Sequence, residues 1–94
     1  MKASDMKKIL AIISQCDVLT IEKKDKDLII AATGTIIIAM RKVGLISAQI
    51  SALYAILTES TWDDGYFCAC VRQIINAIWP VVDTYEMIAE ALYA

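Results

Sequence analysis

The sequence predicts an α+β fold: an N-terminal helix, a small antiparallel β-hairpin or three-stranded meander, and then three helices. Three observations support this prediction. Apolar residues recur at helical spacing near both ends of the chain, β-branched residues concentrate in the charge-free stretch Leu28–Met40, and a charged, turn-like segment at 25–27 precedes that stretch. Ninety-four residues are enough for one modest core, so we expect a single domain over residues 1–94.

The first predicted element is an amphipathic helix at about residues 5–15. Its apolar positions follow the spacing of one helical face, and polar residues occupy the opposite face. Ser4 or Asp5 is placed to cap its first turn. The apolar positions are Met6, Ile9, Leu10 and Ile13.

Strands are predicted next. Val18–Lys24 and Leu28–Thr33 are the first two, and Asp25-Lys26-Asp27 is the turn between them. Thr33-Gly34 is a second candidate turn, because glycine tolerates the positive φ of tight turns. Thr35–Met40 would then be a third strand, since β-branched side chains lose rotamer freedom in a helix.

Two other interpretations of Leu28–Met40 stay open. The stretch could form one buried helix, in which Gly34 costs about 1 kcal/mol; the fold would then be an all-α bundle. It could also enter a membrane, but a spanning helix needs about 20 apolar residues. Extension of the stretch would bury Arg41 and Lys42, at about 2.5–3.5 kcal/mol each. Strands are therefore preferred.

Two helices are predicted in the middle of the chain. Ser47 caps the first, which runs to about Thr58 with an apolar stripe of Ile50, Leu53, Tyr54 and Leu57. Thr61 is the predicted cap of the second, with Asp64 three residues further on in a capping-box pattern. The apolar face of this helix is formed by Phe67, Val71, Ile74, Ile75 and Ile78.

Pro80 is expected to end or kink that helix and to move Trp79 away from helical geometry. Asp83 begins a similar capping pattern for a last helix. Its inward-facing residues are predicted to be Tyr85, Ile88 and Leu92.

The composition argues against an enzyme. There is no histidine, which removes the usual general base near neutral pH and the commonest metal ligand. Cys68 and Cys70 point in different directions on a helix, and Cys16 is the only other cysteine, so no four-ligand zinc site is expected. Three glycines cannot build a phosphate-binding loop. We therefore predict no catalytic residue, no metal and no cofactor.

The charges and cysteines suggest a location and disfavour some partners. Residues 1–42 carry eight basic and five acidic side chains, a net charge of +3, whereas residues 43–94 carry one basic and six acidic ones, a net charge of −5. Acidic residues interleave the lysines and the whole chain is acidic, so nucleic-acid binding is disfavoured. An odd number of cysteines gives no disulfide framework, and we expect a reduced, cytoplasmic protein.

The sequence therefore predicts a non-enzymatic protein-interaction module that associates with itself. It would act as an inhibitor, adaptor or small regulatory subunit, of the sort that phages and mobile elements encode. An apolar content of 59% is high for so small a chain, and exposed apolar patches commonly mark a partner surface. The alternatives are a membrane-associated protein and a nucleic-acid regulator. Aromatic residues are enriched at binding hot spots, so the predicted partner surface is Trp62, Asp63, Asp64, Tyr66, Trp79, Tyr85, Glu86 and Tyr93.

Overall fold

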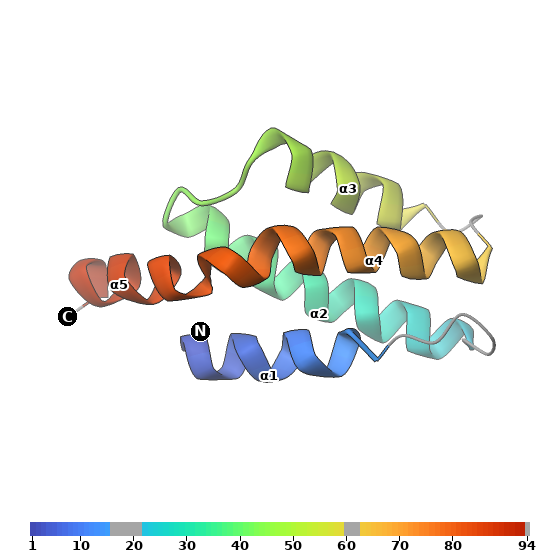
Figure 1. The fold of residues 1–94 in the computed structure, drawn as a ribbon, viewed down its shortest axis with the longest axis horizontal. Coiled ribbons are helices and arrows are strands. Elements are labelled where there is room, and N and C mark those ends of the chain that lie inside the picture. Colours follow the sequence, from blue (N-terminus) through green and yellow to red (C-terminus); the bar gives the residue numbers. More distant parts are fainter. Residues whose placement is uncertain (16–21, 60–62, 94) are drawn as a thin grey trace.

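The computed structural model describes residues 1–15, 22–59 and 63–93, and in these ranges every regular element is helical. The helices are α1 (Ala3–Ile13), α2 (Lys23–Lys42), α3 (Ala48–Thr58), α4 (Asp64–Ile78), the short 3-10 helix η1 (Trp79–Val81) and α5 (Val82–Tyr93). The first four run in alternating directions along the long axis of a bundle that measures 42 × 24 × 19 Å, and η1 and α5 continue onward from α4 (Figure 1).

The predicted α+β fold is wrong, and the alternative all-α bundle agrees with the structure. Leu28–Met40, expected to form two strands and a turn, lies within the 20-residue helix α2. The charged segment at 25–27 forms the first turns of this helix, and Arg41 and Lys42 lie in its last turn, where basic side chains favour the helix dipole. The strand preference of β-branched residues is weak and depends on context, and burial of one face of α2 outweighs it.

Glycines mark both the middle and the end of α2. A Cβ at Gly34 would overlap the hydroxyl oxygen of Tyr54 from α3 and lie 3.2 Å from its Cζ. The Tyr54 hydroxyl donates a hydrogen bond to the carbonyl oxygen of Ile30 (3.3 Å), so Gly34 lets α3 approach α2 closely. Gly44 has φ of 76° and ends the helix in a Schellman motif, in which Leu45 N–H donates to Met40 O (2.9 Å).

The other predicted helices are present, with some differences at their ends. Ser47 caps α3 as expected, since its hydroxyl accepts the Ile50 N–H (3.2 Å). The first helix begins earlier than predicted, at Ala3 after Lys2, without a side-chain cap. The cap of α4 is Asp63, not Thr61, and Thr61 lies outside the described residues.

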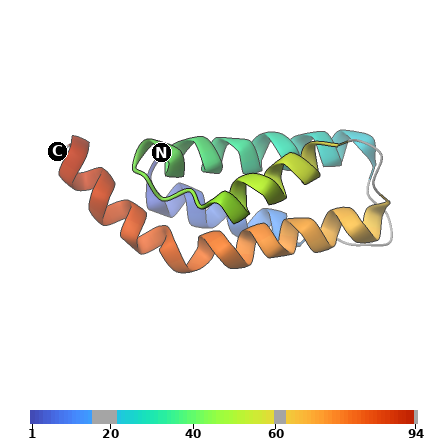
Figure 2. The ribbon, with the colours of Figure 1, turned by 90° about the horizontal axis from the view of Figure 1, so that it is seen from above.

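Pro80 lies in η1 and bends the chain between α4 and α5, as Figure 2 shows. Trp79 nevertheless keeps helical angles (φ −51°, ψ −46°), so the prediction that proline would displace it from helical geometry is wrong. The chain continues through a 3-10 turn, which tolerates proline near its start. As a result, α5 leaves the bundle at an angle and its end extends beyond α1 and α2.

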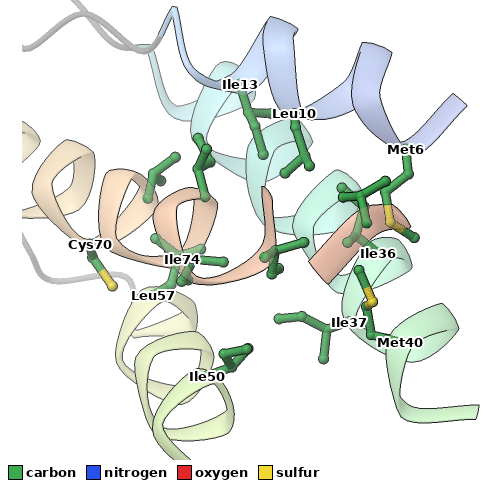
Figure 3. Close-up of a cluster of buried hydrophobic side chains, with 14 of the residues drawn as sticks. Met6, Leu10, Ile13, Ile36, Ile37, Met40, Ile50, Leu57, Cys70 and Ile74 are labelled. Carbon is green, nitrogen blue, oxygen red and sulfur yellow. The ribbon is translucent and has the colours of Figure 1, made fainter. Parts of the chain in front are cut away.

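The core lies between α1, α2, α3 and α4 (Figure 3). Met6, Leu10, Ile36, Met40 and Ile74 are fully buried there. Phe67 is buried, as expected, and so is Tyr85 of α5. Leu92, predicted to face inward, is 59% exposed because the end of α5 has no neighbouring helix to cover it.

Candidate functional site

An apolar surface runs along the outward side of α2. Leu28 is 67% exposed and Ile38 is 55% exposed, and Ala31 and Thr35 between them are also exposed. The spacing of these four residues is three, four and three, so they form a single stripe along the helix. We call this stripe, Leu28, Ala31, Thr35 and Ile38, the α2 outer face. Figure 2 shows α2 along one long edge of the molecule and α4 and α5 along the other.

The outer face exists because α2 is apolar on two sides. Its inward side buries Thr33, Gly34, Ile36, Ile37 and Met40. A helix of a soluble protein usually carries polar residues opposite its buried stripe, and a helix that is apolar all round is usually covered all round. In the structure α2 is covered on one side only, which leaves apolar surface of the kind that marks interaction sites.

Charged residues are confined to the two ends of this face. Asp27 is exposed at its start, and Arg41 and Lys42 are exposed at its end. Lys24 forms an ion pair with Glu22 (3.3 Å) within the same chain. The face is therefore an uncharged strip with Lys24 and Asp27 near one end and Arg41 and Lys42 near the other.

A hollow of about 420 Å³ adjoins the end of the outer face. Thr35, Ile38, Ala39 and Lys42 form its α2 side, and Met1 and Tyr85 lie opposite. The Tyr85 hydroxyl donates to the carbonyl oxygen of Met1, which ties the start of the chain to α5. A second hollow of about 720 Å³ lies on the other side of this contact, between the start of α1 and the acidic residues Glu86 and Glu90.

The end of α5 is a second exposed apolar region. Met87 is 72% exposed and Leu92 is 59% exposed, but the acidic residues Asp83, Glu86 and Glu90 lie on the same helix. Taken as one helical run, Asp64–Leu92 is long and apolar enough to cross a membrane by length and composition, although 44% of its most apolar window is buried in the bundle. Core helices of soluble proteins, which are mostly buried, have the same length and composition.

The aromatic and acidic residues predicted to bind a partner do not form one surface. Asp63 caps α4 by accepting the Tyr66 N–H (2.8 Å). Asp64 forms an ion pair with Lys26 (2.5 Å), whose ammonium group lies 5.6 Å from the Phe67 ring centre. Both carboxylates therefore hold the start of α4 in place, near the start of α2.

The remaining predicted residues lie further along the chain. Tyr66 and Trp79 are half-exposed, but 13 residues of helix, about 20 Å, separate them. Tyr85 is 4% exposed, and Glu86 is exposed beside the larger hollow. Tyr93 ends α5, its side chain lying outside the described part, and Trp62 lies outside the described residues altogether.

The cysteines of α4 are buried among apolar side chains. The Cys70 thiol donates to the carbonyl oxygen of Leu53 (3.2 Å), and burial raises its pKa above the ordinary 9.0. A thiol in this state is a poor nucleophile, because the thiolate is the reactive form. Within residues 1–15, 22–59 and 63–93, no three cysteine or carboxylate side chains gather as metal ligands would.

Sequence reasoning missed the α2 outer face because it assigned Leu28–Met40 to strands. In a strand, successive residues alternate between two faces, and Leu28, Ala31, Thr35 and Ile38 do not share one. The signal is present at helical spacing: once the stretch is treated as a helix, these four residues form a stripe separate from the buried one.

Comparisons of this chain with protein families, with curated proteins and with solved structures found no match.

Proposed function

We propose that this chain is a non-enzymatic protein-interaction module of the cytoplasm that associates with itself and acts as an inhibitor, adaptor or small regulatory subunit. The observation that carries the proposal is the α2 outer face, on which Leu28 and Ile38 remain more than half exposed. Burial of apolar surface stabilises by about 25 cal/mol per Å². Contact with a second protein surface would therefore be favourable on this side of the bundle.

Two further features support a binding role. Near the start of α2, Lys24 pairs with Glu22 and Lys26 with Asp64, and the whole chain carries a net charge of −2. This balance of charges does not favour binding to a nucleic acid. The thiol of Cys70 is buried and protonated, which agrees with a structural role for that residue.

Sedimentation equilibrium of the full chain over a wide range of concentrations tests this proposal. We expect the weight-average mass to rise above that of the 10.4 kDa chain as the concentration increases, in buffer without detergent. A mass that stays at 10.4 kDa throughout contradicts self-association.

A second candidate function is association with a membrane surface, and the exposed apolar side chains of α5 favour it. Exposed Met87 and Leu92 would enter the interface, while Asp83, Glu86 and Glu90 would remain in water. Flotation with neutral phosphatidylcholine vesicles separates the two functions. Recovery of the chain with the vesicles supports the membrane candidate, and recovery in the soluble fraction supports the interaction module.

A further inference from the structure

We propose that the α2 outer face is the surface on which two copies of this chain pair, with their α2 helices antiparallel about a two-fold axis. This inference depends on the proposed function and gives it a specific surface and partner. It follows from three properties of the outer face: its spacing, its end charges and its size.

The spacing of the outer face is that of a helix–helix seam. Leu28, Ala31, Thr35 and Ile38 alternate by three and four residues, which matches the a and d positions of a heptad. In an antiparallel pair, Leu28 of one copy lies opposite Ile38 of the other, and Ala31 lies opposite Thr35. The order large, small, small, large is the same from both ends, as a two-fold interface requires, because the same patch must be complementary to itself.

The charges at the ends of the face favour the antiparallel orientation. Asp27 and Arg41 are two heptads apart and lie on the same flank of the stripe, and both are exposed. An antiparallel pair places Asp27 of each copy near Arg41 of the other, which gives two ion pairs by symmetry. In a parallel pair the two copies of each of these positions would lie on opposite flanks of the seam, so Asp27 and Arg41 would form no ion pair across it.

Lys24 and Lys42 lie opposite each other at the outer limits of this pair. The ion pair between Lys24 and Glu22 offsets their repulsion. The exposed end of α5 is a poorer candidate for self-pairing, because Glu86 and Glu90 adjoin its apolar residues. An antiparallel pair of α5 helices would bring these like charges together on the same flank.

The size of the face predicts a weak dimer. A 20-residue helix is about 30 Å long. Pairing along most of that length buries about 1,000 Å², near the lower end of specific interfaces. Because the central residues are Ala31 and Thr35, the contact is close but has no large buried anchor. We expect a dissociation constant on the order of 10 μM.

The first test is sedimentation equilibrium of the full-length Ile38→Asp variant. The substitution puts a carboxylate into the apolar seam at two symmetric positions, so we expect the dimer to be lost at concentrations where the wild-type chain pairs. Met87→Asp is the matched control, because Met87 is more exposed than Ile38 but lies on α5. This control should pair like the wild-type chain. Circular dichroism establishes that both variants keep their helices.

The second test exchanges the end charges. Asp27→Arg and Arg41→Asp each replace two ion pairs with two like-charge contacts, and each should weaken the dimer by about tenfold. The double variant restores opposite charges in the exchanged order, and its affinity should return to within about threefold of the wild-type value. A parallel dimer would not show this rescue.

The outcomes separate this inference from the proposed function. A wild-type dimer that survives Ile38→Asp, or that Met87→Asp abolishes instead, overturns the inference while self-association stands. A dimer that both single charge variants weaken and the double variant does not restore overturns the antiparallel arrangement. A chain that is monomeric at every concentration overturns both proposals, and so does a chain that associates only in the presence of vesicles.

Discussion

The two longest helices, α2 and α4, lie along opposite edges of the molecule and differ in what they do with their outward sides. On α4, the inward side buries Phe67, Val71, Ile74 and Ile78, and the outward side carries the polar residues Arg72, Gln73 and Asn76. On α2, the inward side is buried in the same way, but the outward side is apolar from Leu28 to Ile38. Burial in this bundle therefore accounts for every isoleucine and valine of α4, whereas Leu28 and Ile38 of α2 remain more than half exposed.

The largest expected effect separates a buried isoleucine of α4 from an exposed isoleucine of α2. Ile74 is fully buried, so Ile74→Ala should lower the free energy of unfolding by about 3 kcal/mol through lost burial and a cavity. Ile38→Ala should change it by about 0.5 kcal/mol or less in dilute solution. Urea denaturation well below the dimer dissociation constant measures both values. Equal losses would show that Ile38 belongs to the core.

The inward side of α2 can be tested at its closest contact. Gly34→Ala should lower the free energy of unfolding by about 1–3 kcal/mol, because the new methyl group overlaps the Tyr54 hydroxyl. In an isolated helix the same Gly→Ala substitution would stabilise by about 1 kcal/mol, so the predicted loss has the opposite sign. In a Tyr54→Phe background the hydroxyl is absent and the loss should shrink. A stabilised Gly34→Ala variant would contradict the close packing of α2 on α3.

The starts of the two helices differ as well. Asp63 accepts the Tyr66 N–H at the start of α4, whereas Glu22 makes no side-chain cap for α2. Asp63→Ala should therefore lower the free energy of unfolding by about 1 kcal/mol, and Glu22→Ala by less than about 0.5 kcal/mol. Thermal unfolding followed by circular dichroism compares the two. A silent Asp63→Ala variant would return Asp63 to the set of partner-binding candidates.

The smallest expected effect is a loss of stability at alkaline pH. Burial raises the pKa of Cys70 above 9.0, so the unfolded chain ionises first and stability falls as the pH rises above about 9. A hydrogen bond to Asp83 raises the pKa of Lys7 above 10.5, and its contribution is complete below that pH and is lost as the pH rises through the raised value. Urea midpoints of the wild-type, Cys70→Ala and Lys7→Met chains between pH 7 and 11 distinguish the contribution of Cys70 to this loss of stability from that of Lys7. An unchanged pH profile in Cys70→Ala would contradict the first assignment.

The difference between α2 and α4 also determines what the sequence could predict. The buried stripe of α4 alternates with polar residues at helical spacing, and both the helix and its core face were predicted correctly. Between Leu28 and Met40 no charged residue interrupts the apolar run. The stretch therefore has no polar face that would show whether its apolar residues repeat with the period of a helix or of a strand. The isoleucines at 36–38 then favoured a strand. The Schellman motif at Gly44 and the contact between Gly34 and Tyr54 depend on tertiary structure that local propensity does not contain.

The predicted partner surface followed residue type rather than position. Asp63 and Asp64 turned out to stabilise the start of α4, and Tyr85 lies in the core. Trp79 and Glu86 are exposed as a partner surface requires, but the length of α4 separates Trp79 from Tyr66, and Glu86 lies beyond the bend at Pro80. The outer face has no aromatic residue and therefore none of the features that selected the candidates. It becomes visible once residues 28–40 are placed on a helix, which separates it from the buried stripe.

The central claim is that the two sides of α2 have different partners: the core of the same chain on one side, and a second copy on the other. Methyl NMR spectra of the full chain at rising concentration test it most directly. We predict that the methyl signals of Leu28 and Ile38 shift together along one binding curve, while those of Met87 and Leu92 stay fixed. Signals of Leu28 and Ile38 that stay fixed while those of Met87 and Leu92 move would contradict the claim.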